Sequence, residues 1–96
     1  GRLRYFILAL MFMINIKNMG TLKNLTRAMS NQGYDLVKMI YDGEFNELTI
    51  KYDNENSTED YIWEVTVEAN VQEEEYGVPT IIDITKVNME NTGKLV

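Results

Sequence analysis

Acidic side chains are the main candidates for chemistry in this sequence. The chain has no histidine and no cysteine, so it lacks the usual acid–base group at neutral pH, the commonest zinc ligand and a thiolate nucleophile. Glu64 and Glu68 have the even spacing that puts two carboxylates on one face of a strand. Acid–base catalysis by such a pair needs a cleft that separates the two pKa values, and an exposed sheet face provides none. We therefore expect that the protein is not an enzyme.

A polar segment in the middle of the chain has the ligand spacing of a calcium-binding loop. Its sixth position is Thr58, where the sharp turn of such a loop needs glycine, and sequences typical of strands flank it in place of helices. We expect a hydrated acidic loop without a bound metal or cofactor, and weak cation binding is the open alternative. The oxygen-bearing side chains at the ligand positions are Asp53, Glu55, Ser57, Glu59 and Glu64.

The acidic residues are concentrated in the second half of the chain. The whole sequence has a formal net charge of -6, but residues 1–43 are net basic and residues 44–96 are strongly acidic. Negative charge repels a phosphate backbone, so we expect no nucleic-acid partner and favour a protein with a basic surface. The side chains predicted to meet that partner are Glu55, Glu59, Asp60, Glu64, Glu68, Glu73, Glu74, Glu75 and Tyr76.

This charge pattern favours a small, non-enzymatic protein-binding module in the cytoplasm, with secretion less favoured. The composition, acidic and without cysteine, is typical of phage-encoded or bacterial accessory proteins and inhibitors. Two alternatives remain open: a regulatory domain that binds a small molecule or cation, and a structural subunit of an oligomer. An acidic surface that only keeps the protein soluble is the simplest explanation of the charge.

An apolar run near the start of the chain predicts self-association. The uninterrupted run over residues 5–14 is too short to span a bilayer, and no small-residue cleavage site follows it, so we expect no membrane partner. We expect an apolar N-terminal strand over residues 1–17. Apolar residues on both faces of that strand need two covering surfaces, and a homo-oligomer supplies the second. The predicted interface residues are Tyr5, Phe6, Ile7, Leu8, Leu10, Phe12 and Ile14.

The rest of the chain predicts one helix followed by a β-meander. A helix over residues 18–33 buries an apolar face that includes Leu22, Leu25 and Met29, and Gly33 supplies the left-handed residue that ends it. Within the meander, residues 34–88, Asp42-Gly43 is typical of a two-residue type I′ hairpin turn. Strand alternation places Leu48, Ile50 and Tyr52, and then Trp63, Val65, Val67 and Ala69, on the core side. We expect residues 89–96 to form a polar tail.

These elements predict a single α+β domain over residues 1–96. The order is strand, helix and four further strands, which predicts an antiparallel meander of about five strands packed on one helix. The order is similar to that of the cystatin or monellin type of fold, in which a curved sheet wraps one helix. The Gln-Val-x-Ala-Gly hairpin and Pro-Trp loop with which cystatins grip proteases have no counterpart here, so the resemblance implies the fold alone.

A second resemblance is local. The segment Asn18-Met19-Gly20-Thr21-Leu22, with Leu25, Met29, Gly33 and Leu36 after it, is similar to the strand-to-helix turn of ACT regulatory domains. In that family the start of the helix faces an amino-acid ligand, so the resemblance implies the small-molecule alternative. An ACT domain also needs a second helix, and the segment between Tyr52 and Tyr61 is too short to form it.

Overall fold

The computed structural model describes residues 20–72 and 80–96. The predicted N-terminal strand with its oligomer interface, residues 5–14, lies outside the described residues, and so do the acidic positions 73–76. The elements in chain order are β1 (Gly20–Thr21), α2 (Leu22–Ser30), β2 (Asp35–Asp42), β3 (Glu47–Asp53), β4 (Tyr61–Gln72) and β5 (Thr80–Leu95).

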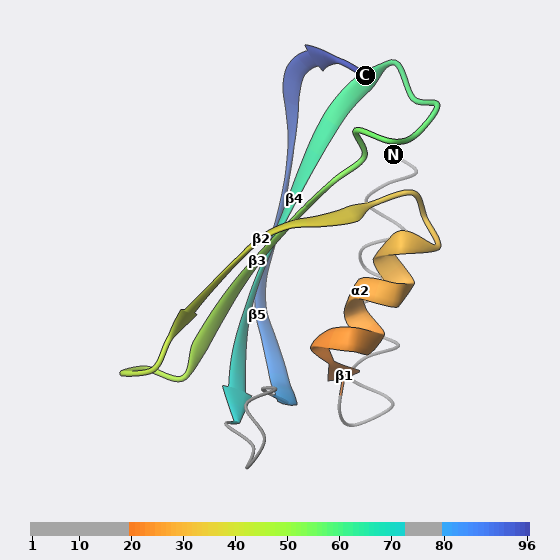
Figure 1. Ribbon diagram of the computed structural model, residues 1–96. Helices are drawn as coiled ribbons and strands as arrows, with labels where there is room; N and C mark the ends of the chain where they lie inside the picture. Colours follow the sequence, from red (N-terminus) through yellow and green to blue (C-terminus); the bar gives the residue numbers. More distant parts are fainter. Residues whose placement is uncertain (1–19, 73–79) are drawn as a thin grey trace.

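The described residues form an antiparallel sheet with one short helix against it, so the fold is mostly β and broadly α+β (Figure 1). Strands β2 to β5 follow one another across the sheet as a meander, as the sequence predicted. The long strands are four, however, and not the five that we expected. The strand before the helix is the two-residue β1, which pairs with β5 through Gly20 opposite Ile81 and Thr21 opposite Thr80.

The core lies between α2 and the central strands. Leu25 and Met29 on the helix are completely buried, and Leu22 and Ala28 are half-buried beside them, which confirms the predicted apolar face. Trp63 packs at the margin of this core and is only partly buried. The strand residues that complete the core are Leu48, Ile50, Tyr52, Val65, Val67, Ala69, Val71, Ile81 and Ile84.

The helix ends as the sequence predicted but is shorter than residues 18–33. Gly33 has a φ of 88°, a conformation that a residue with a Cβ rarely adopts. Its N–H donates to the Ser30 carbonyl at 2.9 Å, and the Tyr34 N–H donates to the Met29 carbonyl at 3.0 Å. These bonds satisfy carbonyls at the end of α2 and direct the chain into β2.

The connection between β2 and β3 corrects one prediction. Asp42 pairs with Glu47, so residues 43–46 form a four-residue loop and not a two-residue type I′ turn. Asn46 has the positive φ, 51°, and the Asp42 Oδ1 accepts a hydrogen bond from the Glu44 N–H at 3.0 Å. The core-facing side chains Leu48, Ile50 and Tyr52 are buried as predicted, because their alternation along β3 does not depend on the length of the turn.

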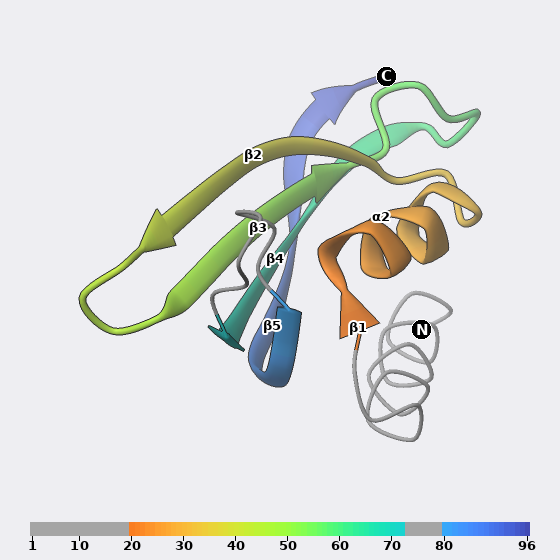
Figure 2. The ribbon, with the colours of Figure 1, turned by 60° about the horizontal axis from the view of Figure 1, so that its bottom comes forward.

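Strand β5 corrects a second prediction. Residues 89–95, which we expected in a polar tail, continue β5 and pair with the first half of β4. Trp63 lies opposite Asn91, and the Thr92 hydroxyl donates to the Ile62 carbonyl at 2.8 Å. At the other side of the sheet, the β2–β3 hairpin projects away from α2 (Figure 2).

Candidate protein-binding surface

Acidic side chains line up across the sheet face that points away from α2. Asp35 lies directly opposite Asp53, Asp53 opposite Glu64, and Glu64 opposite Glu90, so one carboxylate comes from each of β2, β3, β4 and β5. We call these four residues the acidic row. Like charges directly opposite one another on neighbouring strands are destabilising. The arrangement therefore has an electrostatic cost in the free protein.

The loop between β3 and β4 is fixed at the same end of the sheet as the acidic row. Asn54 is 1% exposed, and its side chain joins the two ends of the loop. Its Oδ1 accepts from the Trp63 N–H at 2.6 Å, and its Nδ2 donates to the Tyr61 carbonyl at 3.1 Å. Asn56 Nδ2 donates to Asp35 Oδ2 at 3.2 Å, which ties the loop to the row itself.

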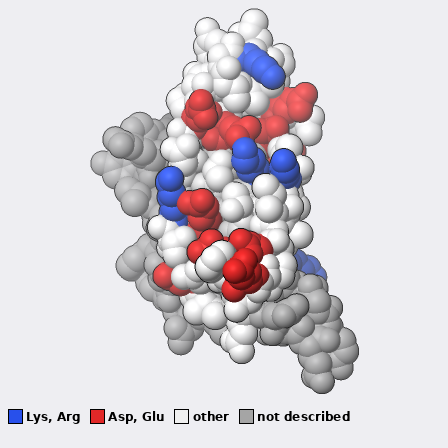
Figure 3. All heavy atoms as spheres, turned by 90° about the vertical axis from the view of Figure 1, so that its left-hand side faces the viewer, with Lys and Arg blue, Asp and Glu red and all other residues white. Residues whose placement is uncertain are grey.

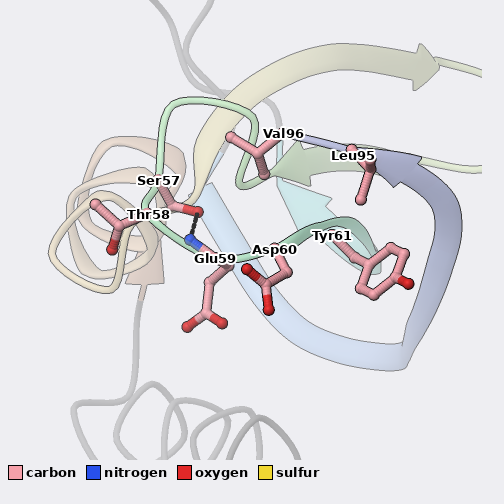
Figure 4. A pocket seen from close by; sticks show the side chains of 7 residues that line it. All are labelled: Ser57, Thr58, Glu59, Asp60, Tyr61, Leu95 and Val96. Atoms are coloured by element: carbon pink, nitrogen blue, oxygen red, sulfur yellow. Dashed lines mark hydrogen bonds between the residues drawn. The ribbon is translucent and has the colours of Figure 1, made fainter.

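The predicted acidic residues of this loop, Glu55, Glu59 and Asp60, are all exposed. Figure 4 shows Glu59 and Asp60 at an open hollow, where the Glu59 N–H donates to Ser57 Oγ at 3.1 Å. The side chains that line the hollow are Ser57, Thr58, Glu59, Asp60, Tyr61, Leu95 and Val96. Among the described residues, no group of three or more acidic side chains is arranged to hold a metal ion.

Two lysines divide the acidic stripe that the sequence predicted. Glu64 and Glu68 lie on the outward face of β4, but Lys51 Nζ is 3.4 Å from Glu64 Oε1 and Lys86 lies directly opposite Glu68. Figure 3 shows basic side chains between an upper and a lower group of acidic ones on this side of the molecule. Glu64 belongs both to this stripe and to the acidic row, so Lys51 also offsets part of the negative charge of the row.

Sequence reasoning missed Asp35 and Glu90 as site residues and assigned Asp53 to a ligand position of the cation-like loop and not to the protein-binding surface. Asp35 and Asp53 stand at the ends of their strands and Glu90 lies in the part of β5 that we expected as a tail, and the sequence does not show which residues lie beside them. Their alignment depends on strand register, including a bulge between Leu36 and Lys38.

In the part of the chain that the structure describes, two buried tyrosines have perturbed pKa values. Burial, together with the smaller effect of the nearby Glu59 carboxylate, raises the pKa of Tyr34 to about 12. Burial also raises the pKa of Tyr52, against the smaller effect of its hydrogen bond to Thr26 Oγ1 at 2.9 Å. Both phenols are therefore neutral at physiological pH, and both belong to the core and not to the acidic face.

The chain was also compared with known proteins. Comparisons with protein-family models, curated proteins and solved structures found no match. A functional account therefore depends on the chemistry of the surface. In the described part of the chain, no helix has the length and apolar character needed to cross a membrane.

Proposed function

We propose that the chain is a small, non-enzymatic module that presents the acidic row to a basic surface on a protein partner. The observation that carries the proposal is the alignment of Asp35, Asp53, Glu64 and Glu90 on four adjacent strands. Their mutual repulsion is reduced when cationic side chains of a partner lie over them. The free protein already bears this repulsion, so its reduction in the complex makes the free energy of binding more favourable.

The backbone that presents these carboxylates is ordered before any partner arrives. The four strands that carry them are hydrogen-bonded side by side in the sheet, and the buried Asn54 holds the adjoining loop closed. A rigid surface loses little conformational entropy on binding, and fixed charges of one sign increase the rate of encounter with an oppositely charged surface. The loop acids Glu55, Glu59 and Asp60 extend the negative charge beyond the end of the row.

A protein of this kind acts by covering the basic site of its partner, which is the action of an inhibitor or accessory protein. We place that action in the cytoplasm, in line with the absence of cysteine from the sequence. Residues 73–76 remain predicted members of the contact surface. The partner class is a basic protein, since the same negative charge disfavours nucleic acid.

Capture of proteins from a lysate of the source cells on matched baits tests the proposal. The first bait is the wild-type chain, and the second carries Asp53→Asn, Glu64→Gln and Glu90→Gln. The control bait carries Glu44→Gln, Glu47→Gln and Asp83→Asn, which remove the same charge from exposed positions outside the row. We expect a basic protein that the wild type and the control retain at low salt, that high salt elutes, and that the row variant fails to retain. Equal capture by the row variant would contradict the proposal.

A further inference from the structure

The outer edge of β2 is open in the described part of the chain. β2 ends the sheet order, and each of its residues is exposed. Its large apolar side chains, Leu36, Val37, Met39, Ile40 and Tyr41, are between 40% and 58% exposed. An edge strand with free backbone N–H and C=O groups and apolar side chains is a template for pairing with another strand.

We propose that β2 pairs antiparallel with β2 of a second copy of this chain, around a two-fold axis at Ile40. In this register Ile40 lies opposite Ile40 of the second copy on the outward face. On the face that carries α2, Met39 lies opposite Tyr41 of the second copy, and the pair occurs twice by symmetry. The two sheets then form one continuous sheet with both helices on the same side.

The charges of β2 select this register. Within its own chain, Lys38 lies directly opposite Lys51, and Asp42 lies directly opposite Glu47, so the β2–β3 ladder contains two like-charge pairs. Each of these pairs is destabilising alone. In the dimer Lys38 lies opposite Asp42 of the second copy. The charged residues across the two sheets are then, in order, Lys51 and Lys38 of one copy, followed by Asp42 and Glu47 of the other.

Neighbouring registers lack this complementarity. An axis at Lys38 places lysine opposite lysine, and an axis at Met39 places Lys38 opposite Ile40 of the second copy. A lysine in an edge strand normally prevents pairing with other chains, as does a bulge such as the one between Leu36 and Lys38. Here the lysine permits pairing only with a strand that offers an acid at the matching position, and β2 itself offers Asp42.

Charge reversal tests the pairing without damage to the fold. Lys38→Asp places aspartate opposite Asp42 of the second copy, and Asp42→Lys places lysine opposite Lys38. Each single variant also turns a like-charge pair within the chain, with Lys51 or with Glu47, into an opposite-charge pair. The monomer fold is therefore expected to persist, and circular dichroism verifies that it does.

Sedimentation of the full chain gives the readout. We expect the wild type to be a dimer at about 100 µM, each single variant to weaken dimerisation by about tenfold or more, and the Lys38→Asp/Asp42→Lys double variant to restore it. Hydrogen exchange of the β2 amides should slow as the wild-type concentration rises. A monomeric wild type at that concentration, or a dimer that both single variants leave unchanged, would overturn the proposal. The second outcome would assign self-association to another surface, such as residues 5–14.

Discussion

Replacing Asn54 by alanine removes both hydrogen bonds that close the loop between β3 and β4. The Trp63 N–H loses its acceptor at 2.6 Å, and the Tyr61 carbonyl loses its donor at 3.1 Å. Asn54 is 1% exposed, so water does not readily replace the amide. A buried polar group left without a partner costs about 1–3 kcal/mol, so the two groups together should lower the free energy of unfolding by about 2–6 kcal/mol.

Urea unfolding measures this loss, with Trp63, the only tryptophan, as the fluorescent reporter. Asn56→Ala is the matched control, because its bond to Asp35 is exposed and its loss should change stability by about 0.5 kcal/mol or less. Asn54→Asp keeps the acceptor for Trp63 but loses the donor to Tyr61. Since burial raises the pKa of that new carboxyl, the variant should recover part of its stability as the pH falls and the carboxyl becomes a donor. An Asn54→Ala variant as stable as Asn56→Ala would refute the role of Asn54.

Three further predictions concern the core and the helix end. Tyr52→Phe removes the hydrogen bond to Thr26 but keeps the buried ring, so urea unfolding should show a loss of about 1 kcal/mol. Tyr34 has a native pKa of about 12 against 10.0 for a free phenol, so its contribution to stability is complete below pH 10 and declines between about pH 10 and 12 as the unfolded chain ionises first. The free energy of unfolding of Tyr34→Phe should therefore fall less steeply than that of the wild type over this pH range. An equally steep fall in the two proteins would contradict this assignment. Gly33→Ala should cost about 1–2 kcal/mol in thermal or urea unfolding through the positive φ alone, since the added Cβ would lie 3.7 Å from the Ser57 Cβ, an ordinary contact.

The core-facing side chains were predictable from the sequence because burial imposes a period on them. Leu25 and Met29 on the helix, and Leu48 and Ile50 on β3, are buried as their spacing indicates. The end of the helix at Gly33 followed from the conformational freedom of glycine. These features depend on local pattern alone, so no knowledge of strand pairing was needed.

The features that depend on pairing could not be predicted in the same way. Asp42-Gly43 fits a two-residue turn, but the chain closes a longer loop with Asn46 as its left-handed residue, and this changes which residues of β2 and β3 lie opposite each other. The second half of β5 is mostly polar, with Met89 packed against the margin of the core, and it is a strand because it pairs with the first half of β4. The acidic row combines both effects, since Glu64 meets Asp53 through one pairing and Glu90 through the other.

The central claim is that the acidic row is repulsive in the free protein and is therefore available to a basic partner. The free energy of unfolding of Asp53→Asn, measured at low and at high salt, tests this most directly. Asp53 lies between Asp35 and Glu64, and asparagine keeps the Oδ1 that accepts from the Glu55 N–H. We predict that the variant is more stable than the wild type by about 0.5 kcal/mol at low salt and that the difference disappears at high salt. A variant that is less stable than the wild type at low salt, or a difference that salt leaves unchanged, would contradict the account.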